Sequence, residues 1–254
     1  FTPGFPSCVN HWAKIATLLD IENEGSASHD KALVAQTFGR ETGFLAGSIR
    51  VIDPLRKLPI ALLLPEDKRP INDVIRYIDQ LITKHGRAMV YISEGYDLGV
   101  LGTVHDATGQ IMYGSSKSTS AQLLVDELIE NNIQARSYIP TVLQRQAIDD
   151  TLSIDRLVAF KQGCLIIKQL AEGNDSFLAT IKKSISHHLE DSIDTIEFKN
   201  FDNYSRILKD DFIYKGQFDV SDAYLHYLND ILRLQSDNSL NYGYKDKNFL
   251  RSFY

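Results

Sequence analysis

A glycine and an arginine follow the first strongly apolar run of the chain. The segment Thr37-Phe38-Gly39-Arg40 comes directly after Ala32–Thr37 and leads into a predicted helix. A glycine there lets a ligand approach the backbone closely, and the first turn of a helix offers free amides to an anion. The forked guanidinium of Arg40 suits a phosphate group. The alternative is that Gly39 only makes the turn and that Arg40 is solvated.

Two carboxylates occupy matching positions after later apolar runs. Glu66 follows Leu62-Leu63-Leu64-Pro65, and Glu94 follows Tyr91-Ile92-Ser93 and precedes a glycine. A carboxylate at such a position can accept hydrogen bonds from sugar hydroxyls. An acidic residue that favours a helix start, or a satisfied turn, explains either position equally well.

Two further cations, Arg136 and Arg145, lie nine positions apart and flank a run that reads as a strand. If the run is extended, the strand rise separates them by about 30 Å. They could not then share one ligand within a subunit. Either one of them is incidental, or the two serve two sites that oligomer symmetry relates.

The elements that position these residues alternate between strand and helix. Such alternation predicts an α/β fold with a doubly wound parallel sheet, in which ligands bind at the carboxyl ends of the strands. The predicted strands are Ala32–Thr37, Pro59–Leu64 and Ala88–Ile92, and the predicted helices between them cover Thr42–Val51 and Ile71–Ile82.

Outside this alternation the patterns are more varied. We predict a first helix from Pro6, a polar loop over 23–30, a glycine-rich loop over 97–120, a strand over 136–142 and helices over 121–129, 153–170 and 221–232. The predicted divisions are a core over 1–180, a C-terminal segment over 181–235 that packs back on it, and a polar, aromatic tail over 236–254.

Composition limits the function classes. The net charge of −6 argues against nucleic acid as a partner, because a phosphate backbone needs a basic face. Cys8 and Cys164 lack metal-ligand spacing and predict a reducing, cytoplasmic location, with Cys164 in the core. No apolar run approaches the roughly 20 residues of a membrane span. No phosphate-cradling loop, serine elbow or general base is evident, and we read the pair His187-His188 as an exposed strand segment.

Taken in order, these segments resemble phosphofructokinases, most closely their pyrophosphate-dependent branch. Thr37-Phe38-Gly39-Arg40 is similar to the family's Met-Gly-Arg motif, with phenylalanine in place of methionine. Leu64-Pro65-Glu66, Ser93-Glu94-Gly95 and Leu143-Gln144-Arg145 match the next three motifs. Thr141-Val142 stands where ATP-dependent members carry Gly-His, which favours the pyrophosphate branch.

The resemblance implies phosphorylation of fructose 6-phosphate at its 1-hydroxyl by pyrophosphate, with Mg²⁺. It assigns Phe38, Gly39, Arg40, Glu66 and Arg145 to the sugar phosphate. It also implies a homo-oligomer in which two cations, Arg136 and Lys31, reach a neighbouring subunit's site.

The resemblance also implies an incomplete active site. The family's donor-phosphate loop and the loop with its catalytic aspartate precede Thr2-Pro3-Gly4, so we expect the base, the magnesium ligands and most of the donor lobe in a missing N-terminal half or a companion chain. No catalytic residue is assigned to this chain. The alternatives are an ATP-dependent enzyme, a catalytically silent regulatory subunit and an unrelated scaffold domain.

Overall fold

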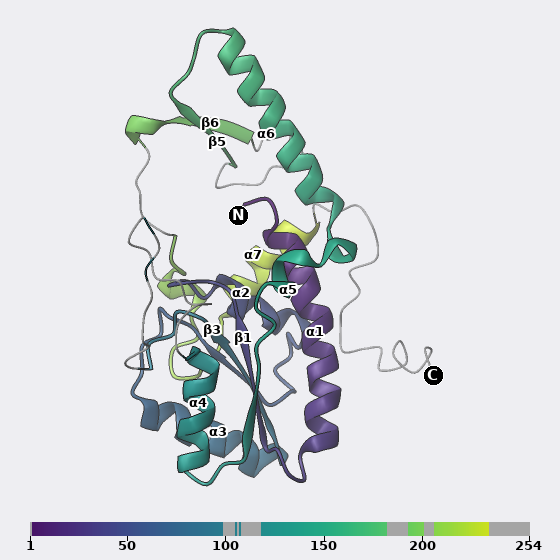
Figure 1. Ribbon diagram of the computed structural model, residues 1–254, viewed down its shortest axis with the longest axis vertical. Coiled ribbons are helices and arrows are strands. Elements are labelled where there is room, and N and C mark those ends of the chain that lie inside the picture. Colours follow the sequence, from purple (N-terminus) through teal and green to yellow (C-terminus); the bar gives the residue numbers. More distant parts are fainter. Residues whose placement is uncertain are drawn as a thin grey trace.

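The computed structural model describes residues 2–98, 105, 107, 118–181, 193–200 and 206–233. Its centre is a parallel sheet in the order β2-β3-β1-β4 (Figure 1). In register, Ala32 of β1 lies beside Ala88 of β3 and Ala135 of β4, and Ile60 of β2 lies beside Met89. The strands are β1 (Ala32–Thr37), β2 (Ile60–Leu63), β3 (Ala88–Ser93) and β4 (Ala135–Tyr138).

Each face of the sheet has its own apolar core, because successive strand residues point to opposite faces. Leu33, Ala35 and Tyr91 pack against one set of helices, whereas Val34 and Val90 pack against another. The first set is α1 (Phe5–Ser26), α2 (Phe44–Ser48), the 3₁₀ helix η1 (Ile49–Ile52) and α7 (Asp222–Arg233); the second is α3 (Ile71–His85) and α4 (Ser120–Glu130). Helices on both faces confirm the predicted doubly wound α/β fold.

Local sequence explains where the main helices of the second face begin and end. Pro70 precedes α3, and Gly86 ends it in the left-handed region with φ of 79°. The hydroxyl of Thr119 accepts a hydrogen bond from the amide of Gln122 and so caps α4. These residues mark both ends of α3 and the start of α4.

A second, smaller unit projects from the sheet-bearing body, at the top of Figure 1. It consists of α6 (Ser153–Ala171) and an antiparallel pair of strands, β5 (Phe177–Ile181) and β6 (Ile193–Glu197). Short helices join the units: α5 (Leu143–Gln146), η3 (Ile148–Asp150), η5 (Phe198–Asn200) and η6 (Asp210–Phe212). The predicted divisions near 180 and 235 stay a prediction. No helix in the described part of the chain is long and apolar enough to span a membrane.

Three local predictions were wrong. Helix α1 continues to Ser26 through part of the predicted loop, because Asn23 is buried and accepts a hydrogen bond from Arg87. The last predicted strand ends early: β4 stops at Tyr138, and the chain turns into α5, so the extended separation of the two arginines does not apply. Cys164 is exposed and lies outside the core. The predictions for His187-His188, for most of 97–120 and for the tail lie outside the described residues.

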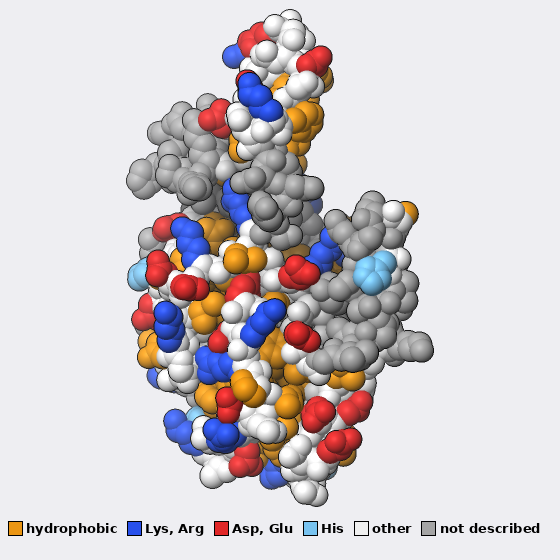
Figure 2. Space-filling view, turned by 90° about the vertical axis from the view of Figure 1, so that its left-hand side faces the viewer, with side chains coloured by type: hydrophobic (Ala, Val, Ile, Leu, Met, Phe, Trp, Pro, Cys, Tyr) orange, Lys and Arg blue, Asp and Glu red, His pale blue; other side chains and the backbone are white. Residues whose placement is uncertain are grey.

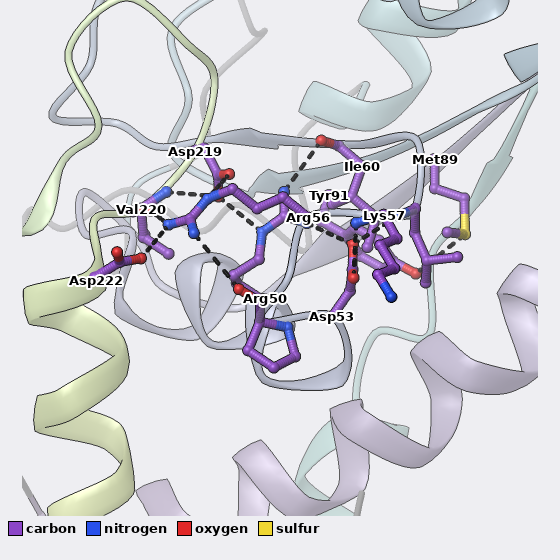
Figure 3. A network of polar contacts seen from close by, with 12 residues as sticks. Arg50, Asp53, Arg56, Lys57, Ile60, Met89, Tyr91, Asp219, Val220 and Asp222 are labelled. Carbon is purple, nitrogen blue, oxygen red and sulfur yellow. Dashed lines mark hydrogen bonds and ion pairs between the residues drawn. The ribbon is translucent and has the colours of Figure 1, made fainter. Parts of the chain in front are cut away.

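A buried ion network fastens α7 and the segment before it to the sheet (Figure 3). The guanidinium of Arg50 donates to Asp219 Oδ1 over 2.9 Å and to Asp53 Oδ2 over 3.1 Å, and it also donates to the carbonyl of Ile60. Arg56 donates to the second oxygen of Asp219 over 3.1 Å. The network therefore joins residues more than 160 positions apart in the sequence.

Removal of the central cation tests this network. We expect Arg50→Ala to lower the free energy of unfolding by about 3 kcal/mol, because it leaves two buried carboxylates short of a positive partner. Arg76→Ala is the matched control: Arg76 is 67% exposed and pairs with Asp73 on α3, so its loss should cost less than about 1 kcal/mol. Urea denaturation of both variants measures the difference. Equal losses of unfolding free energy in the two variants would show that the buried network does not stabilise the fold.

Candidate active site

The candidate site lies where the winding of the sheet reverses. The chain leaves β1 toward α2 on one face, and it leaves β3 toward α4 on the other. Strands β1 and β3 are neighbours, with Thr37 beside Ser93 at their carboxyl ends. In open α/β sheets a crevice opens at such a point and ligands bind there.

The carboxylate of Glu94 holds the turn that follows β1. Its Oε1 accepts hydrogen bonds from the amides of Gly39, over 3.3 Å, and Arg40, over 3.0 Å. Both residues have positive φ, 156° for Gly39 and 49° for Arg40, which is uncommon for a residue with a side chain. The two hydrogen bonds offset the cost of this conformation and fix the direction in which Arg40 leaves the sheet.

The end of β3 also approaches this turn at close range. The hydroxyl of Ser93 donates to the carbonyl of Thr42 over 3.0 Å and lies 3.3 Å from the carbonyl of Arg40. A Cβ atom on Gly95 would lie 1.9 Å from the same Arg40 oxygen. Glycine is therefore required at 95 for the two strand ends to meet.

The environment of Glu94 raises its pKa. Burial is the main cause, because it penalises the charged carboxylate. The amide hydrogen bonds of Arg40 and Gly39, and the positive charges of Arg145 and Arg40, act in the opposite direction and lower the pKa. The net shift is upward, so the carboxyl takes up a proton more readily than an exposed glutamate.

The side chain of Gln144 connects three elements behind the pocket. Its Oε1 accepts hydrogen bonds from the indole of Trp12, over 2.9 Å, and from the amide of Phe38, over 3.0 Å. Its Nε2 donates to the carbonyl of Thr141 over 3.3 Å. Gln144 is buried, and it therefore fixes the position of the neighbouring Arg145 relative to the turn after β1.

Arg145 and Phe38 form one wall of a pocket of about 520 Å³. The guanidinium carbon of Arg145 lies 4.4 Å from the centre of the Phe38 ring, a cation–π contact that holds the charged group flat against an apolar surface. The other walls come from the start of α1, the turn after β1, the start of α2, α5 and the start of α6; they include Gly4, Ser7, Cys8, His11, Gly39, Thr42, Phe44, Gln144, Ile148 and Asp155.

The structure brings three of the predicted residues, Phe38, Gly39 and Arg145, to this pocket. Arg40 lies in the same turn but is not among the lining residues. Glu66 is directed to the backbone: it accepts hydrogen bonds from the amides of Gly43, over 3.0 and 3.1 Å, and Leu208, over 2.8 Å. The roles of Arg40 and Glu66 in sugar binding stay predictions.

The two remaining cations lie at the amino ends of the strands, opposite the ends that face the pocket. Lys31 directly precedes β1, and Arg136 pairs with Leu33 near the amino end of that strand. Arg136 forms ion pairs with Glu22, over 2.5 Å, and with Asp30, over 3.7 Å. Neither residue reaches the pocket of its own subunit, and their predicted role across an interface stays a prediction.

Sequence reasoning missed a contact between two helix starts beside the pocket. Asp155 Oδ2 accepts hydrogen bonds from the amide of Ser7, over 2.8 Å, and from its hydroxyl. The same hydroxyl accepts a hydrogen bond from the amide of Leu152 over 2.9 Å. Ser7 and Asp155 lie 148 positions apart, so no local pattern reveals the pair.

Burial and the nearby Asp155 raise the pKa of the Cys8 thiol, despite the opposing charge of Arg145.

The described residues of the pocket do not fit a magnesium ion. No group of three or more histidine, cysteine, aspartate or glutamate side chains in the described part of the chain could hold a metal. Asp155 is the single carboxylate among the lining residues, and one of its oxygens already accepts two hydrogen bonds from Ser7. The predicted Mg²⁺ therefore receives no ligand set from these residues.

Comparison with known proteins identifies the family. Residues 1–170 match the family model described as Phosphofructokinase. The chain belongs to the phosphofructokinase family. No curated protein matches the chain.

Solved structures show the same fold as this phosphofructokinase chain. The pyrophosphate-dependent phosphofructokinase of Nitrosospira multiformis superposes with a TM-score of 0.73 and 21% identity, over 91% of this chain and 55% of that one. The enzyme of the same name from Marinobacter aquaeolei gives 0.66 and 18%, over 89% and 55%. Phosphofructokinase from Saccharomyces cerevisiae gives 0.52 and 20%, over 78% and 24%. The chain thus spans about half the length of the first two structures.

The raised pKa of Glu94 predicts a pH dependence of stability. Between the ordinary glutamate value of 4.5 and the raised value, the folded chain holds more protons than the unfolded chain, so its stability falls as the pH rises. Glu94→Gln does not titrate, and its amide oxygen can still accept a hydrogen bond from the turn. We expect the stability of wild type relative to this variant to decrease as the pH rises above the ordinary glutamate value.

Urea denaturation of both proteins at a series of pH values measures this difference. Asp73→Asn, at an exposed position on α3, serves as the control substitution. Parallel pH profiles for wild type and Glu94→Gln would show that Glu94 has an ordinary pKa in the folded chain.

Proposed function

We propose that this chain supplies the sugar-phosphate site of a phosphotransferase that transfers a phosphoryl group from pyrophosphate to the 1-hydroxyl of fructose 6-phosphate. The observation that carries the proposal is the Arg145 guanidinium, which lies against Phe38 in a pocket at the reversal point of a phosphofructokinase-type sheet. The pocket is of a size typical for small-molecule sites.

The residues around the pocket suggest a division of tasks. Arg145 binds the 6-phosphate through charged hydrogen bonds, and Gly39 leaves room for the sugar at the turn. Arg40 adds positive charge beside the same turn. Glu66 fixes the Gly43 amide at the start of α2, and its part in binding the ring acts through that segment or follows a rearrangement of the carboxylate.

Phosphoryl transfer depends mainly on positioning and on cations that offset the charge of the transition state. Arg145 meets part of this requirement, because Gln144 and Phe38 hold it in place before a ligand binds. The base that activates the sugar hydroxyl and the ligands of Mg²⁺ come, in this proposal, from polypeptide outside this chain.

Two observations favour pyrophosphate over ATP as the donor. Thr141-Val142 replaces the Gly-His of the ATP-dependent enzymes, and the two solved structures with the higher TM-scores bear the name of pyrophosphate-dependent enzymes. A catalytically silent regulatory subunit, which binds a sugar phosphate without turning it over, is the alternative. An assay of phosphate transfer after addition of an intact donor half separates the two functions.

Arg136 and Lys31 complete the proposal for the assembled protein. Both lie near the amino ends of the strands, away from the pocket of their own subunit. We propose that in a homo-oligomer they extend toward the sugar phosphate of a neighbouring subunit. In that state Arg136 exchanges its ion pairs with Glu22 and Asp30 for contacts with the ligand.

Loss of the Arg145 charge tests the site. We expect Arg145→Ala to weaken binding of fructose 6-phosphate by about 1.5–3 kcal/mol, the usual contribution of a hydrogen bond to a charged group. Isothermal titration calorimetry measures the affinity. Arg76→Ala, on the exposed face of α3, is the control and should leave the dissociation constant unchanged. An unchanged constant for Arg145→Ala would remove the basis of the site assignment.

The cation–π contact predicts a second, coupled effect. Phe38→Leu keeps an apolar wall but removes the ring beneath the guanidinium, and we expect it to weaken sugar-phosphate binding by about 0.5–1 kcal/mol. The same substitution in an Arg145→Ala background should have no effect on affinity. Additive effects in this double-mutant cycle would show that Phe38 does not act through Arg145.

A further inference from the structure

The Arg145 segment, residues 141–150, depends on other parts of the chain for its position. Its helix α5 has four residues, and so short a helix is not stable in isolation. Thr141, just before α5, has a φ of 44°, a strained value for a β-branched residue that persists only where surrounding contacts enforce it. The buried side chain of α5 is that of the polar Gln144. Polar contacts with other elements therefore hold the segment in place.

Helix α1 anchors the far end of this segment through Asp150. The imidazole Nδ1 of His11 bonds to Asp150 Oδ2 over 2.6 Å, and the ammonium group of Lys14 bonds to Oδ1 of the same carboxylate. The side-chain amide of Asn10 donates to the main-chain carbonyl of Asp150 over 3.0 Å. The spacing of three and four residues places these side chains on one side of α1, where they converge on a single residue of η3.

The carboxylate of Asp150 is held in its charged form. Burial acts to raise its pKa, but the hydrogen bonds and positive charges of Lys14 and His11 outweigh burial and lower the pKa below the ordinary aspartate value. The side chains of His11 and Asp150 are 14% and 15% exposed, so little solvent competes for their contact. A hydrogen bond to an ionised group is stronger than one between neutral groups. The anchor is therefore firmer than a surface ion pair.

The near end of the segment is held by the same helix. Trp12 is fully buried and donates to the side chain of Gln144 over 2.9 Å, and the thiol of Cys8 donates to the main-chain carbonyl of Gln144 over 3.5 Å. Arg145 lies one residue after this anchor and five residues before Asp150. Because both anchors come from α1, loss of either one lets the guanidinium of Arg145 move away from the Phe38 ring.

We propose that Asp150 and His11 are positioning residues for the sugar-phosphate site, which hold the Arg145 segment so that the guanidinium lies in the pocket before the ligand binds. The role acts through Arg145 and requires no contact with the ligand, although His11 also lines the pocket. The inference rests on the proposed function, in which Arg145 binds the 6-phosphate. It adds the second anchor that keeps this arginine preorganised.

Asp150→Ala tests the anchor, because electrostatics alone predicts the opposite result. Removal of a negative charge beside the pocket favours an anionic ligand, whereas loss of the anchor weakens its binding. Asp149→Ala is the matched control: Asp149 is exposed, belongs to the same short helix η3, and its removal changes the net charge equally.

A control close to the pocket is needed because of the surface charge distribution. Figure 2 shows acidic and basic side chains interspersed over the visible face of the sheet-bearing body. Opposite charges and salt screen the effect of any single carboxylate there on a distant ligand. Asp149 shares the position of Asp150 in the chain, so the two variants differ in the anchor and not in the charge that is removed.

Isothermal titration calorimetry with fructose 6-phosphate measures the affinities. We expect Asp150→Ala to raise the dissociation constant about two- to tenfold, and Asp149→Ala to leave it unchanged or lower it slightly. His11→Ala should also weaken binding, and His11→Asn should restore part of the affinity, because the asparagine amide places an N–H donor near the position of Nδ1. In an Arg145→Ala background neither Asp150→Ala nor His11→Ala should weaken binding further.

Two results would overturn the inference. One is a dissociation constant for Asp150→Ala that is equal to or lower than that of Asp149→Ala. The other is a loss of affinity in His11→Ala that persists in the Arg145→Ala background, which would show that His11 contacts the ligand directly.

The single tryptophan of the chain gives a readout that needs no ligand. Trp12 is bonded to Gln144, so a loosened segment should increase quenching of its fluorescence by acrylamide in Asp150→Ala relative to Asp149→Ala. Equal quenching in the two variants would show that Asp150 does not anchor the segment. If quenching increases while fructose 6-phosphate fails to bind wild type, only the proposed function fails. Should Asp150→Ala not fold, His11→Ala, which leaves Lys14 on the carboxylate, carries both measurements.

Discussion

The carboxylate of Glu94 is the contact on which the rest of the site depends. It binds the two amides of a turn whose backbone is held at positive φ, and it does so from the end of the neighbouring strand. The turn sets the position of Phe38, which is also bonded to Gln144 and forms the surface for the guanidinium of Arg145. A carboxyl group buried behind the turn thus helps to orient a positive charge in front of it. The preorganisation of the pocket follows from this pair of contacts.

Most of the fold could be predicted from the sequence, because its strands are short apolar runs and its helices are strongly amphipathic. The turn at Gly39 was also predictable, since glycine has a specific use at strand ends. Arg145 could be singled out as a forked donor that suits a phosphate, although it lies in α5 and not at a strand end. The role of Gln144 was less accessible: its partners Trp12 and Phe38 lie 132 and 106 positions away. Glu66 has the expected position, but its carboxylate accepts hydrogen bonds from backbone amides. Tertiary packing determines this orientation, and the local sequence does not show it.

The described pocket suits one part of the proposed function, the binding of the sugar phosphate. The described pocket contains an oriented cation and a close backbone approach, which suit a phosphorylated sugar. It has no metal cluster among its described residues, and the projecting unit of α6, β5 and β6 begins at its rim. Under the proposed function, this chain binds and positions the sugar phosphate, and the donor chemistry comes from polypeptide outside it.

A crystal structure of this chain with fructose 6-phosphate would test the central claim most directly. The account predicts that the 6-phosphate lies within hydrogen-bonding distance of the Arg145 guanidinium, with the sugar beside Gly39 and the Phe38 ring still under the arginine. Density for the ligand at another surface, or an empty pocket at saturating ligand, would contradict it.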